Sequence, residues 1–136
     1  ALRMERHSSN ANKGAAYLAK HPKIDWVWHA SLPDNRYHAL ARKYLPEGTG
    51  GMLSFGIRGD VSQAAKFMES LKLITQATHV ADVRSCVLHP ASTTHRQLTK
   101  EELEQAGVPE NLVRLSVGIE NPADIIDDIE QALAHI

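Results

Sequence analysis

The sequence predicts a two-layer α+β sandwich, in which helices pack on one face of a single small sheet. Helical segments alternate with short strand-like segments along the chain, and most of the strand-like segments alternate apolar and polar side chains. Such alternation is typical of strands with one face on a core and the other toward solvent. A length of 136 residues fits one domain, and a hydrophobic content of 43% is ordinary for a globular protein.

The first half of the chain predicts two helices and two strands. Residues 2–22 form a helical segment that ends at a proline, and residues 24–30 follow as a strand with a period of two. A short helix over residues 37–45 also closes at a proline, and a second strand covers residues 51–57. The first helix begins without an N-cap residue, so we expect the natural chain to continue upstream.

The middle of the chain predicts a third helix and a third strand. Residues 61–74 form the helix, with Asp60 as its N-cap. Residues 78–84 are irregular, and a strand over residues 84–90 stops at a proline. Helical spacing predicts one buried face on the third helix, made of Val61, Ala64, Ala65, Met68 and Leu71.

The last third predicts a helix, a strand and a second helix. Thr99 and Glu102 form a capping box for a helix over residues 100–107, and residues 112–119 form the fourth strand. Asn121 caps the final helix, with a proline in its first turn. This helix is expected to bury one stripe, Ile125, Ile126, Ile129, Ala132 and Leu133. Its opposite face is acidic, with Asp124, Asp127, Asp128 and Glu130.

Composition excludes several classes of protein. The formal net charge is -1 and no run of Lys or Arg forms a basic stripe, which argues against nucleic acid as a partner. No apolar run approaches the roughly 20 residues of a membrane span. A single cysteine, Cys86, excludes an internal disulfide and fits a reducing compartment. The first ten residues are polar and do not resemble a signal peptide, so we expect a cytoplasmic protein.

The sequence predicts no metal site. His89 and His95 are six residues apart across a proline, a spacing that matches no standard zinc pattern. With only Cys86, no cysteine-based zinc cage is available, and we interpret this thiol as a buried, inert one. Neither G-x-G-x-x-G nor a P-loop occurs in a context that would bind phosphate.

One arginine interrupts the apolar run of the fourth strand. Alternation places Arg114 on the same side as Leu112, Ser116 and Gly118. It could form a weak ion pair with a nearby carboxylate at the surface, or its guanidinium could bind the carboxylate of a ligand with two parallel hydrogen bonds. Periodicity leaves both readings open. The hydroxyl-rich stretch PASTTH after the third strand is interpreted from spacing as a turn.

The chain nevertheless contains a specific set of sequence motifs in this order: RMERHSSNA, YHALARKYLP, GGMLSFGIRG, HPASTTH and LVRLSVGIE. Together they resemble the carboxyl-terminal domain of the Cys/Met metabolism family of pyridoxal-phosphate enzymes, over nearly the whole chain. The resemblance implies that residues 1–136 are this small domain, with a mainly antiparallel sheet and the cofactor domain absent. It also implies pyridoxal 5'-phosphate as the cofactor of the complete enzyme.

Within that family the chain resembles the O-acetylhomoserine sulfhydrylases most. HPASTTHRQL replaces the HPASMTH usual in the lyases, and Asp82 and Arg84 follow the sulfhydrylase pattern, while His79 and Ala81 depart from it. This implies replacement of the acetate of O-acetylhomoserine by sulfide or methanethiol, giving homocysteine or methionine. The alternatives are a cystathionine gamma-synthase, a methionine gamma-lyase, or a stand-alone module for carboxylate binding or protein interaction.

The resemblance also implies roles for individual residues. Arg114 would bind the α-carboxylate of the amino-acid substrate, His79 would lie near that carboxylate, and Ser92 and Thr93 would line the pocket edge. No catalytic residue is expected in this chain, because the cofactor lysine of the family lies upstream. The chain alone is therefore expected to be inactive, and the complete enzyme to be a homo-oligomer, a tetramer in this family.

Overall fold

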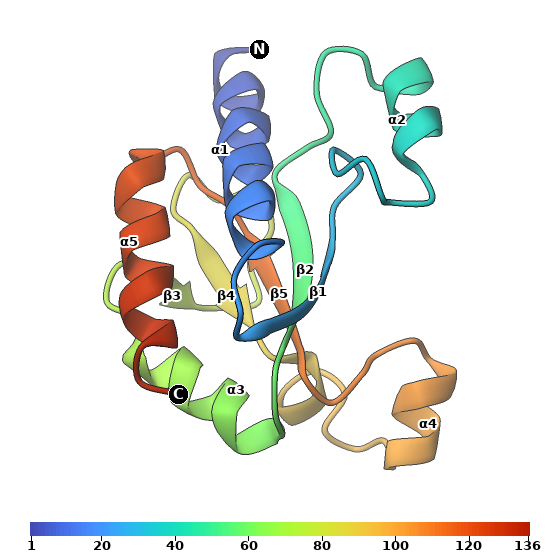
Figure 1. Cartoon of the computed structure of the whole chain (residues 1–136), viewed down its shortest axis with the longest axis vertical. Helices are drawn as coiled ribbons and strands as arrows, with labels where there is room; N and C mark the ends of the chain where they lie inside the picture. Colours follow the sequence, from blue (N-terminus) through green and yellow to red (C-terminus); the bar gives the residue numbers. More distant parts are fainter.

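The computed structural model describes residues 1–136, and its centre is one five-stranded sheet with the order β1-β2-β5-β4-β3 (Figure 1). All neighbouring strands are antiparallel except β3 and β4, which are parallel. The sheet is therefore mainly antiparallel, as expected. Its strands are β1 (Ile24–Trp28), β2 (Met52–Ile57), β3 (Thr75–Gln76), β4 (Cys86–Leu88) and β5 (Leu112–Ser116).

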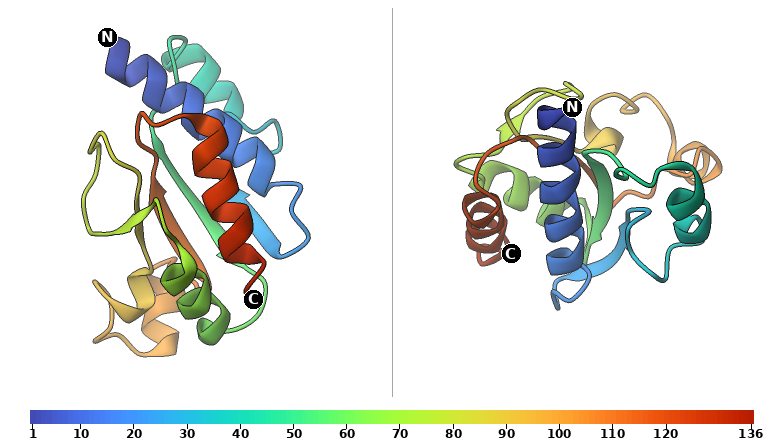
Figure 2. Two further views of the ribbon diagram at one scale, coloured as in Figure 1. Left: turned by 90° about the vertical axis from the view of Figure 1, so that its left-hand side faces the viewer. Right: turned by 90° about the horizontal axis from the view of Figure 1, so that it is seen from above.

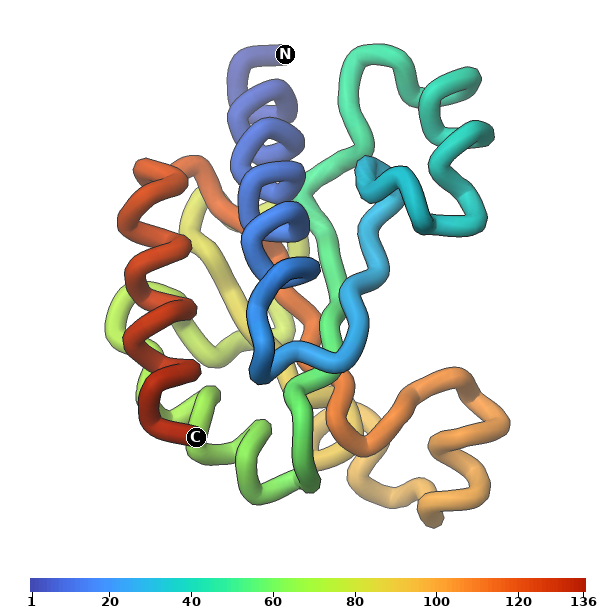
Figure 3. The backbone as a smooth tube through the Cα atoms, in the orientation of Figure 1, coloured from blue at the N-terminus to red at the C-terminus, as the bar shows by residue number.

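The long helices cover one face of this sheet. Helices α1 (Leu2–Leu18) and α5 (Pro122–Leu133) lie side by side across it, and α3 (Val61–Ser70) packs against α5 at one end (Figure 2). Two short helices, α2 (His38–Tyr44) and α4 (Lys100–Gln105), stand at the periphery (Figure 3). The predicted α+β sandwich with its helices on one sheet face is confirmed. None of the helices combines the length and the apolar character that a bilayer span requires.

The core lies between the helices and the closed face of the sheet. Strands β2 and β5 point every second residue toward the helices, so Phe55 and Val113 pair across the strands with no exposure. The Phe55 and Phe67 rings meet edge to face, 5.9 Å apart, which joins α3 to the sheet. The helices contribute mainly small and branched side chains, among them Ala11, Ala15, Leu18, Ile125, Ile129 and Leu133.

Helix α1 also presents buried polar side chains to the segment after β5. The His7 ring lies 2.6 Å from the Val117 carbonyl, and Asn10 Nδ2 donates to the Gly118 carbonyl at 3.0 Å. Because a carbonyl only accepts, His7 Nδ1 carries the proton in this contact. These bonds satisfy backbone groups of the connection between β5 and α5 and set the position of α1 over the sheet.

The predicted third helix is shorter than expected and buries a different face. It ends at Ser70 rather than at residue 74. Its buried side chains are Ala64, Phe67 and Met68, whereas Ala65 and Val61 are exposed. The expected face of five residues was therefore wrong in two positions, because the aromatic ring of Phe67 takes the place against the sheet.

The acidic face predicted for the last helix contains one buried residue. Asp128 is only 6% exposed, and its carboxylate accepts three backbone N–H bonds of 2.8 to 3.0 Å, from Lys72, Leu73 and Ile74. The carboxylate therefore provides a hydrogen-bond acceptor for the backbone N–H groups of the segment between α3 and β3. The sequence had placed Asp128 on the acidic face and gave no sign of its burial, since helical periodicity does not show which carboxylate meets a neighbouring loop.

Candidate functional site

Arg114 lies on the open face of the sheet, opposite the helices. It pairs with Ser54 on β2 and with Leu88 on β4, and Ser54 pairs in turn with Trp28 on β1. The row across this face is therefore Trp28, Ser54, Arg114 and Leu88. Leu112 and Ser116 point to the same side, because side chains two residues apart share a face. The facing predicted from alternation is confirmed by this register.

The loop between β3 and β4 is fastened over this part of the open face (Figure 2). Arg114 Nη2 donates to the Thr78 carbonyl at 3.1 Å, and the Ala81 N–H donates to Ser116 Oγ at 3.1 Å. The sequence placed Ser116 on the same side as Arg114 and assigned it no partner. In the structure its hydroxyl holds the loop, a role that a Ser on a strand does not reveal by itself.

The guanidinium of Arg114 has no acidic partner. The chain forms five ion pairs and none includes Arg114. Its one hydrogen bond goes to a neutral carbonyl, although an arginine side chain has five N–H donors. The residue is half-buried on the central strand. Of the two readings left open by the sequence, the local ion pair is absent, so the arrangement favours binding of an external anion.

His79 follows Thr78 in the same loop, and so lies next to the residue that contacts Arg114. Its side chain is 60% exposed and Nδ1 lies 3.5 Å from Asp82 Oδ2. Asp82 is also hydrogen-bonded by Arg84, which is the main cause that lowers the pKa of Asp82 to about 2. The carboxylate is therefore ionised at neutral pH, and a polar loop of both charges flanks the arginine.

Ser92 and Thr93 lie at the far end of β4, in the 3-10 turn η1 (Pro90–Ser92) and just after it. Thr93 Oγ1 donates to the His89 carbonyl at 2.7 Å, and Ser92 Oγ lies 2.8 Å from His89 Nδ1. Both hydroxyls serve the turn, as spacing alone had favoured. Their predicted place at the pocket edge is a separate expectation that stays a prediction; the turn η1 packs against β5, the strand that carries Arg114.

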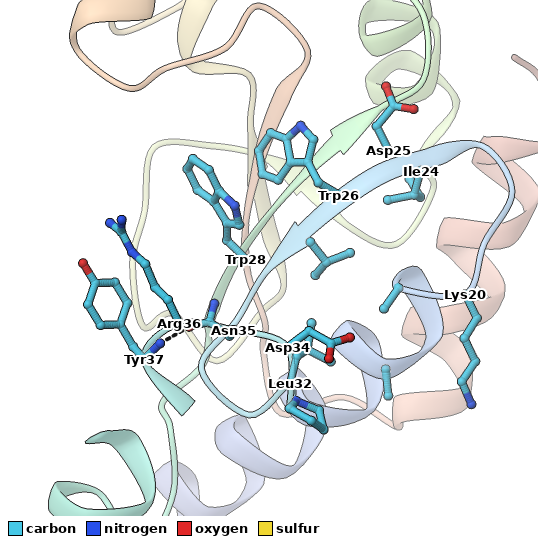
Figure 4. Close-up of a pocket in the computed structure, with 14 residues that line it drawn as sticks. Lys20, Ile24, Asp25, Trp26, Trp28, Leu32, Asp34, Asn35, Arg36 and Tyr37 are labelled. Atoms are coloured by element: carbon cyan, nitrogen blue, oxygen red, sulfur yellow. Dashed lines mark hydrogen bonds between the residues drawn. The ribbon is translucent and has the colours of Figure 1, made fainter. Parts of the chain in front are cut away.

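A large groove lies elsewhere, along the free edge of β1 (Figure 4). It measures about 980 Å³ and is lined by Trp26, Trp28 and the segment after β1, including Arg36 and Tyr37. The two indole rings lie 4.6 Å apart between centroids, tilted by 36°, and Arg36 lies over the Tyr37 ring. Arg114 is not among its lining residues.

The residues around Arg114 fit a carboxylate rather than the anchoring of pyridoxal phosphate. Covalent attachment of this cofactor needs a lysine. None of the seven lysines stands in β1, β2, β4 or β5, or in the loop over the open face. Lys23 donates to the carbonyls of Leu133 and Ile136, and the other six are exposed. This face therefore offers an unpaired guanidinium for an anion, and it does not supply the lysine for the bond to the cofactor.

Comparison with known proteins shows which proteins this chain is similar to. The chain is 48% identical to O-acetyl-L-homoserine sulfhydrylase of Leptospira meyeri, covering 99% of this chain and 31% of the relative. It is 50% identical to homocysteine synthase of Schizosaccharomyces pombe, over 97% of this chain and 31% of that one. The chain thus spans about a third of the length of these relatives.

A crystal structure from Campylobacter jejuni, assigned as an O-acetylhomoserine (thiol)-lyase and carrying N'-pyridoxyl-lysine-5'-monophosphate, superposes with a TM-score of 0.91 at 41% identity. The match covers 98% of this chain and 32% of that one. The family profile described as Cys/Met metabolism PLP-dependent enzyme matches residues 1–134, which confirms the resemblance seen in the sequence. This chain therefore belongs to the Cys/Met metabolism PLP-dependent enzyme family.

Proposed function

We propose that this chain is the substrate-carboxylate-binding domain of an enzyme that replaces the acetate of O-acetylhomoserine by sulfide or methanethiol. The observation that carries the proposal is the unpaired guanidinium of Arg114 on the open face of the sheet. The names of the relatives support the choice of substrate. The products are homocysteine or methionine, together with acetate.

The physical basis is the shape of the guanidinium. It is planar and always charged, and it presents parallel N–H donors that match both oxygens of a carboxylate. Its position on β5, between β2 and β4, leaves the backbone under it rigid, so the donors are already oriented before a ligand arrives. A lysine at this position would supply the charge without the bidentate geometry.

The rest of the reaction belongs to parts of the enzyme beyond these residues. Pyridoxal phosphate, when bound, supplies an electron sink for the bond changes in the substrate. The role of this chain is to hold the substrate by one end, so that its side chain is oriented toward the reacting centre. His79, beside Thr78, adds an imidazole that can donate a hydrogen bond to the same carboxylate. Ser92 and Thr93 are assigned to the edge of the pocket.

We further infer that these residues form the carboxyl-terminal domain of a longer, cytoplasmic chain that assembles as a homo-oligomer. The coverage of about 31% of each relative supports a longer chain. Exposed apolar side chains on and around α2 support an extended interface, because large exposed apolar surface usually marks a contact site. They are Tyr37, Leu40, Tyr44 and Leu45, each at least half exposed.

The test is the Arg114→Ala variant in the full-length enzyme that contains this chain. Loss of a buried, hydrogen-bonded charge partner costs about 2–5 kcal/mol, which corresponds to roughly a 30- to 5,000-fold loss in kcat/KM for O-acetylhomoserine. Arg114→Lys should recover only a small part, because it keeps the charge but not the fork. The measurement is steady-state formation of homocysteine with sulfide as the second substrate.

The matched control is Arg58→Ala, which removes an arginine that is 65% exposed and paired with Asp25. It should change kcat/KM by less than about twofold, since exposed ion pairs contribute little. A kcat/KM of Arg114→Ala within threefold of the wild type would refute the carboxylate-binding role.

The alternatives within the family, a methionine gamma-lyase or a cystathionine gamma-synthase, differ in the second reactant. A lyase consumes methionine and water and releases ammonia, with no second organic substrate. A cystathionine gamma-synthase requires cysteine as the nucleophile. Product analysis with each substrate set separates them. Formation of homocysteine from O-acetylhomoserine and sulfide as the fastest reaction is the result expected here.

A further inference from the structure

A second cluster of chemically reactive side chains lies under the loop between β3 and β4. It consists of an imidazole nitrogen of His79, a carboxylate oxygen of Asp82 and Sγ of Cys86, all within 4.8 Å of one another. Two come from the loop and the third is the first residue of β4. The separation H-x-x-D-x-x-x-C matches no zinc pattern, so spacing did not suggest a site here.

We propose that His79, Asp82 and Cys86 form a binding site for a thiophilic divalent cation of the Zn²⁺ type. Thiolate, imidazole and carboxylate are the three protein ligands that zinc prefers. Three such ligands leave a fourth position open to water or to a small ligand, which is the arrangement of reactive zinc sites rather than of closed structural ones. This departs from the expectation of no metal site, which rested on the spacing of other residues.

The geometry requires only a small closure. Zinc–ligand bonds of about 2.0–2.3 Å place tetrahedral ligand atoms roughly 3.3–3.8 Å apart. His79 Nδ1 and Asp82 Oδ2 already lie 3.5 Å apart, which is within that range. Sγ lies at most 4.8 Å from the other two ligand atoms and would have to approach them by at most about 1.3 Å. The His79 side chain, 60% exposed, is free to rotate toward it.

The cysteine provides the fixed end of the site. Cys86 is 1% exposed and sits on a strand paired with both β3 and β5. Its Sγ lies 3.5 Å from the Arg84 carbonyl, a weak contact that a metal bond would outweigh. The thiol therefore lies in a defined position, and the loop residues close onto it.

In the structure, the Asp82 carboxylate that would bind the cation is paired with Arg84. Its Nε and Nη2 both lie 3.3 Å from carboxylate oxygens of Asp82, at the long end of hydrogen-bond distances. The Arg84 side chain is 63% exposed, so it can turn into solvent when a cation takes its place. The contact exchanged is an exposed ion pair of small energy.

A cation bound at this site would affect the loop that contacts Arg114. Thr78, whose carbonyl accepts from Arg114, adjoins His79, and the Ala81 N–H is bound to Ser116. His79 follows Thr78 and Asp82 follows Ala81, so a cation bound by His79, Asp82 and Cys86 would link this part of the loop to β4. The link would lie beside Arg114.

The experiment is titration of the full-length, thiol-reduced protein with Co²⁺, a spectroscopic substitute for Zn²⁺. We expect visible bands of tetrahedral cobalt together with a thiolate-to-cobalt charge-transfer band in the near ultraviolet. Zn²⁺ should displace the cobalt and remove both. Cys86 is the only cysteine among these 136 residues, so loss of the thiolate band in Cys86→Ser assigns it to this position.

Matched variants separate the site from adventitious binding. His79→Asn removes one ligand from an exposed loop position without disturbing the core, and should weaken Co²⁺ binding at least tenfold. His95→Asn removes a loop imidazole that bonds to Thr94 outside the cluster, and should leave the affinity unchanged. Absence of a thiolate band in the wild type would overturn the proposal. So would a Cys86→Ser or His79→Asn protein that binds Co²⁺ as tightly as the wild type.

Discussion

The two faces of the sheet differ in almost every physical respect. On the closed face, beneath α1, α3 and α5, residues such as Phe55, Val113 and Leu115 are at most 1% exposed. On the open face, Ser54 and Arg114 come from neighbouring positions of the same strands and are only half-buried. A shift of one residue along β2 or β5 therefore crosses from the hydrophobic core to the candidate site.

This difference shows how stability and function are divided in the chain. Burial on the closed face is non-directional, so many apolar side chains of the right volume would serve there. The open face depends on single directional contacts, such as the bonds from Arg114 to Thr78 and from Ala81 to Ser116. We expect substitutions on the first face to change the free energy of unfolding and those on the second to change binding.

The largest effect on stability is expected for Phe55→Ala. This change removes a fully buried ring that packs edge to face on Phe67, and should lower the free energy of unfolding by about 3–5 kcal/mol. The adjacent Ser54→Ala lies on the open face and should stay within about 0.5 kcal/mol. Urea unfolding followed by circular dichroism measures both. Equal losses of unfolding free energy in Phe55→Ala and Ser54→Ala would contradict the difference between the two faces of the sheet.

Asp128→Ala tests the one carboxylate buried among the helices. It leaves the backbone N–H groups of Lys72, Leu73 and Ile74 without their acceptor and should cost about 3 kcal/mol of unfolding free energy. The matched change at the exposed neighbour, Asp127→Ala, should cost less than about 0.5 kcal/mol. The same unfolding assay applies. A cost below about 1 kcal/mol for Asp128→Ala would show that water replaces the carboxylate there.

The smallest effect is expected on the loop over the open face. Ala81 has φ +59°, a left-handed conformation that costs an alanine about 1–2 kcal/mol and glycine almost nothing. Ala81→Gly should therefore stabilise the protein by about 0.5–1 kcal/mol, after the greater entropy of an unfolded glycine is subtracted. Thermal unfolding provides the measurement. Ala65→Gly, at an exposed position inside α3, should have the opposite sign.

Sequence patterns predicted those features that depend on local periodicity. The facing of Arg114 followed from the period of two along β5, and both the N-cap predicted at Asp60 and the capping box predicted at Thr99 are present as side-chain bonds. For the helix at Asp60 only the start was anticipated, since the helix ends at Ser70. Strand β3 was missed because two residues are too few to show any period. It exists only because the parallel neighbour β4 provides partners for its backbone.

The candidate site was predicted in part. The family motif singled out Arg114, and the structure adds that no carboxylate of the chain neutralises it. Ser92 and Thr93 were placed at the pocket by the resemblance, while their hydrogen bonds to His89 explain why such residues also suit a turn. The role of Ser116 in holding the loop was missed, since a hydroxyl on a strand indicates no particular partner.

The amino-acid sequence by itself determined the fold class, the closed face of the sheet and the family, because these depend on periodicity and on short sequence motifs. Only the tertiary structure decided which charged groups meet. Asp128 finds three backbone donors more than fifty residues away, Cys86 lies beneath His79 and Asp82, and Arg114 is left without an acidic neighbour. The physical reason is range: alternation is a property of the local backbone, whereas the partner of a charge is set by how distant segments pack.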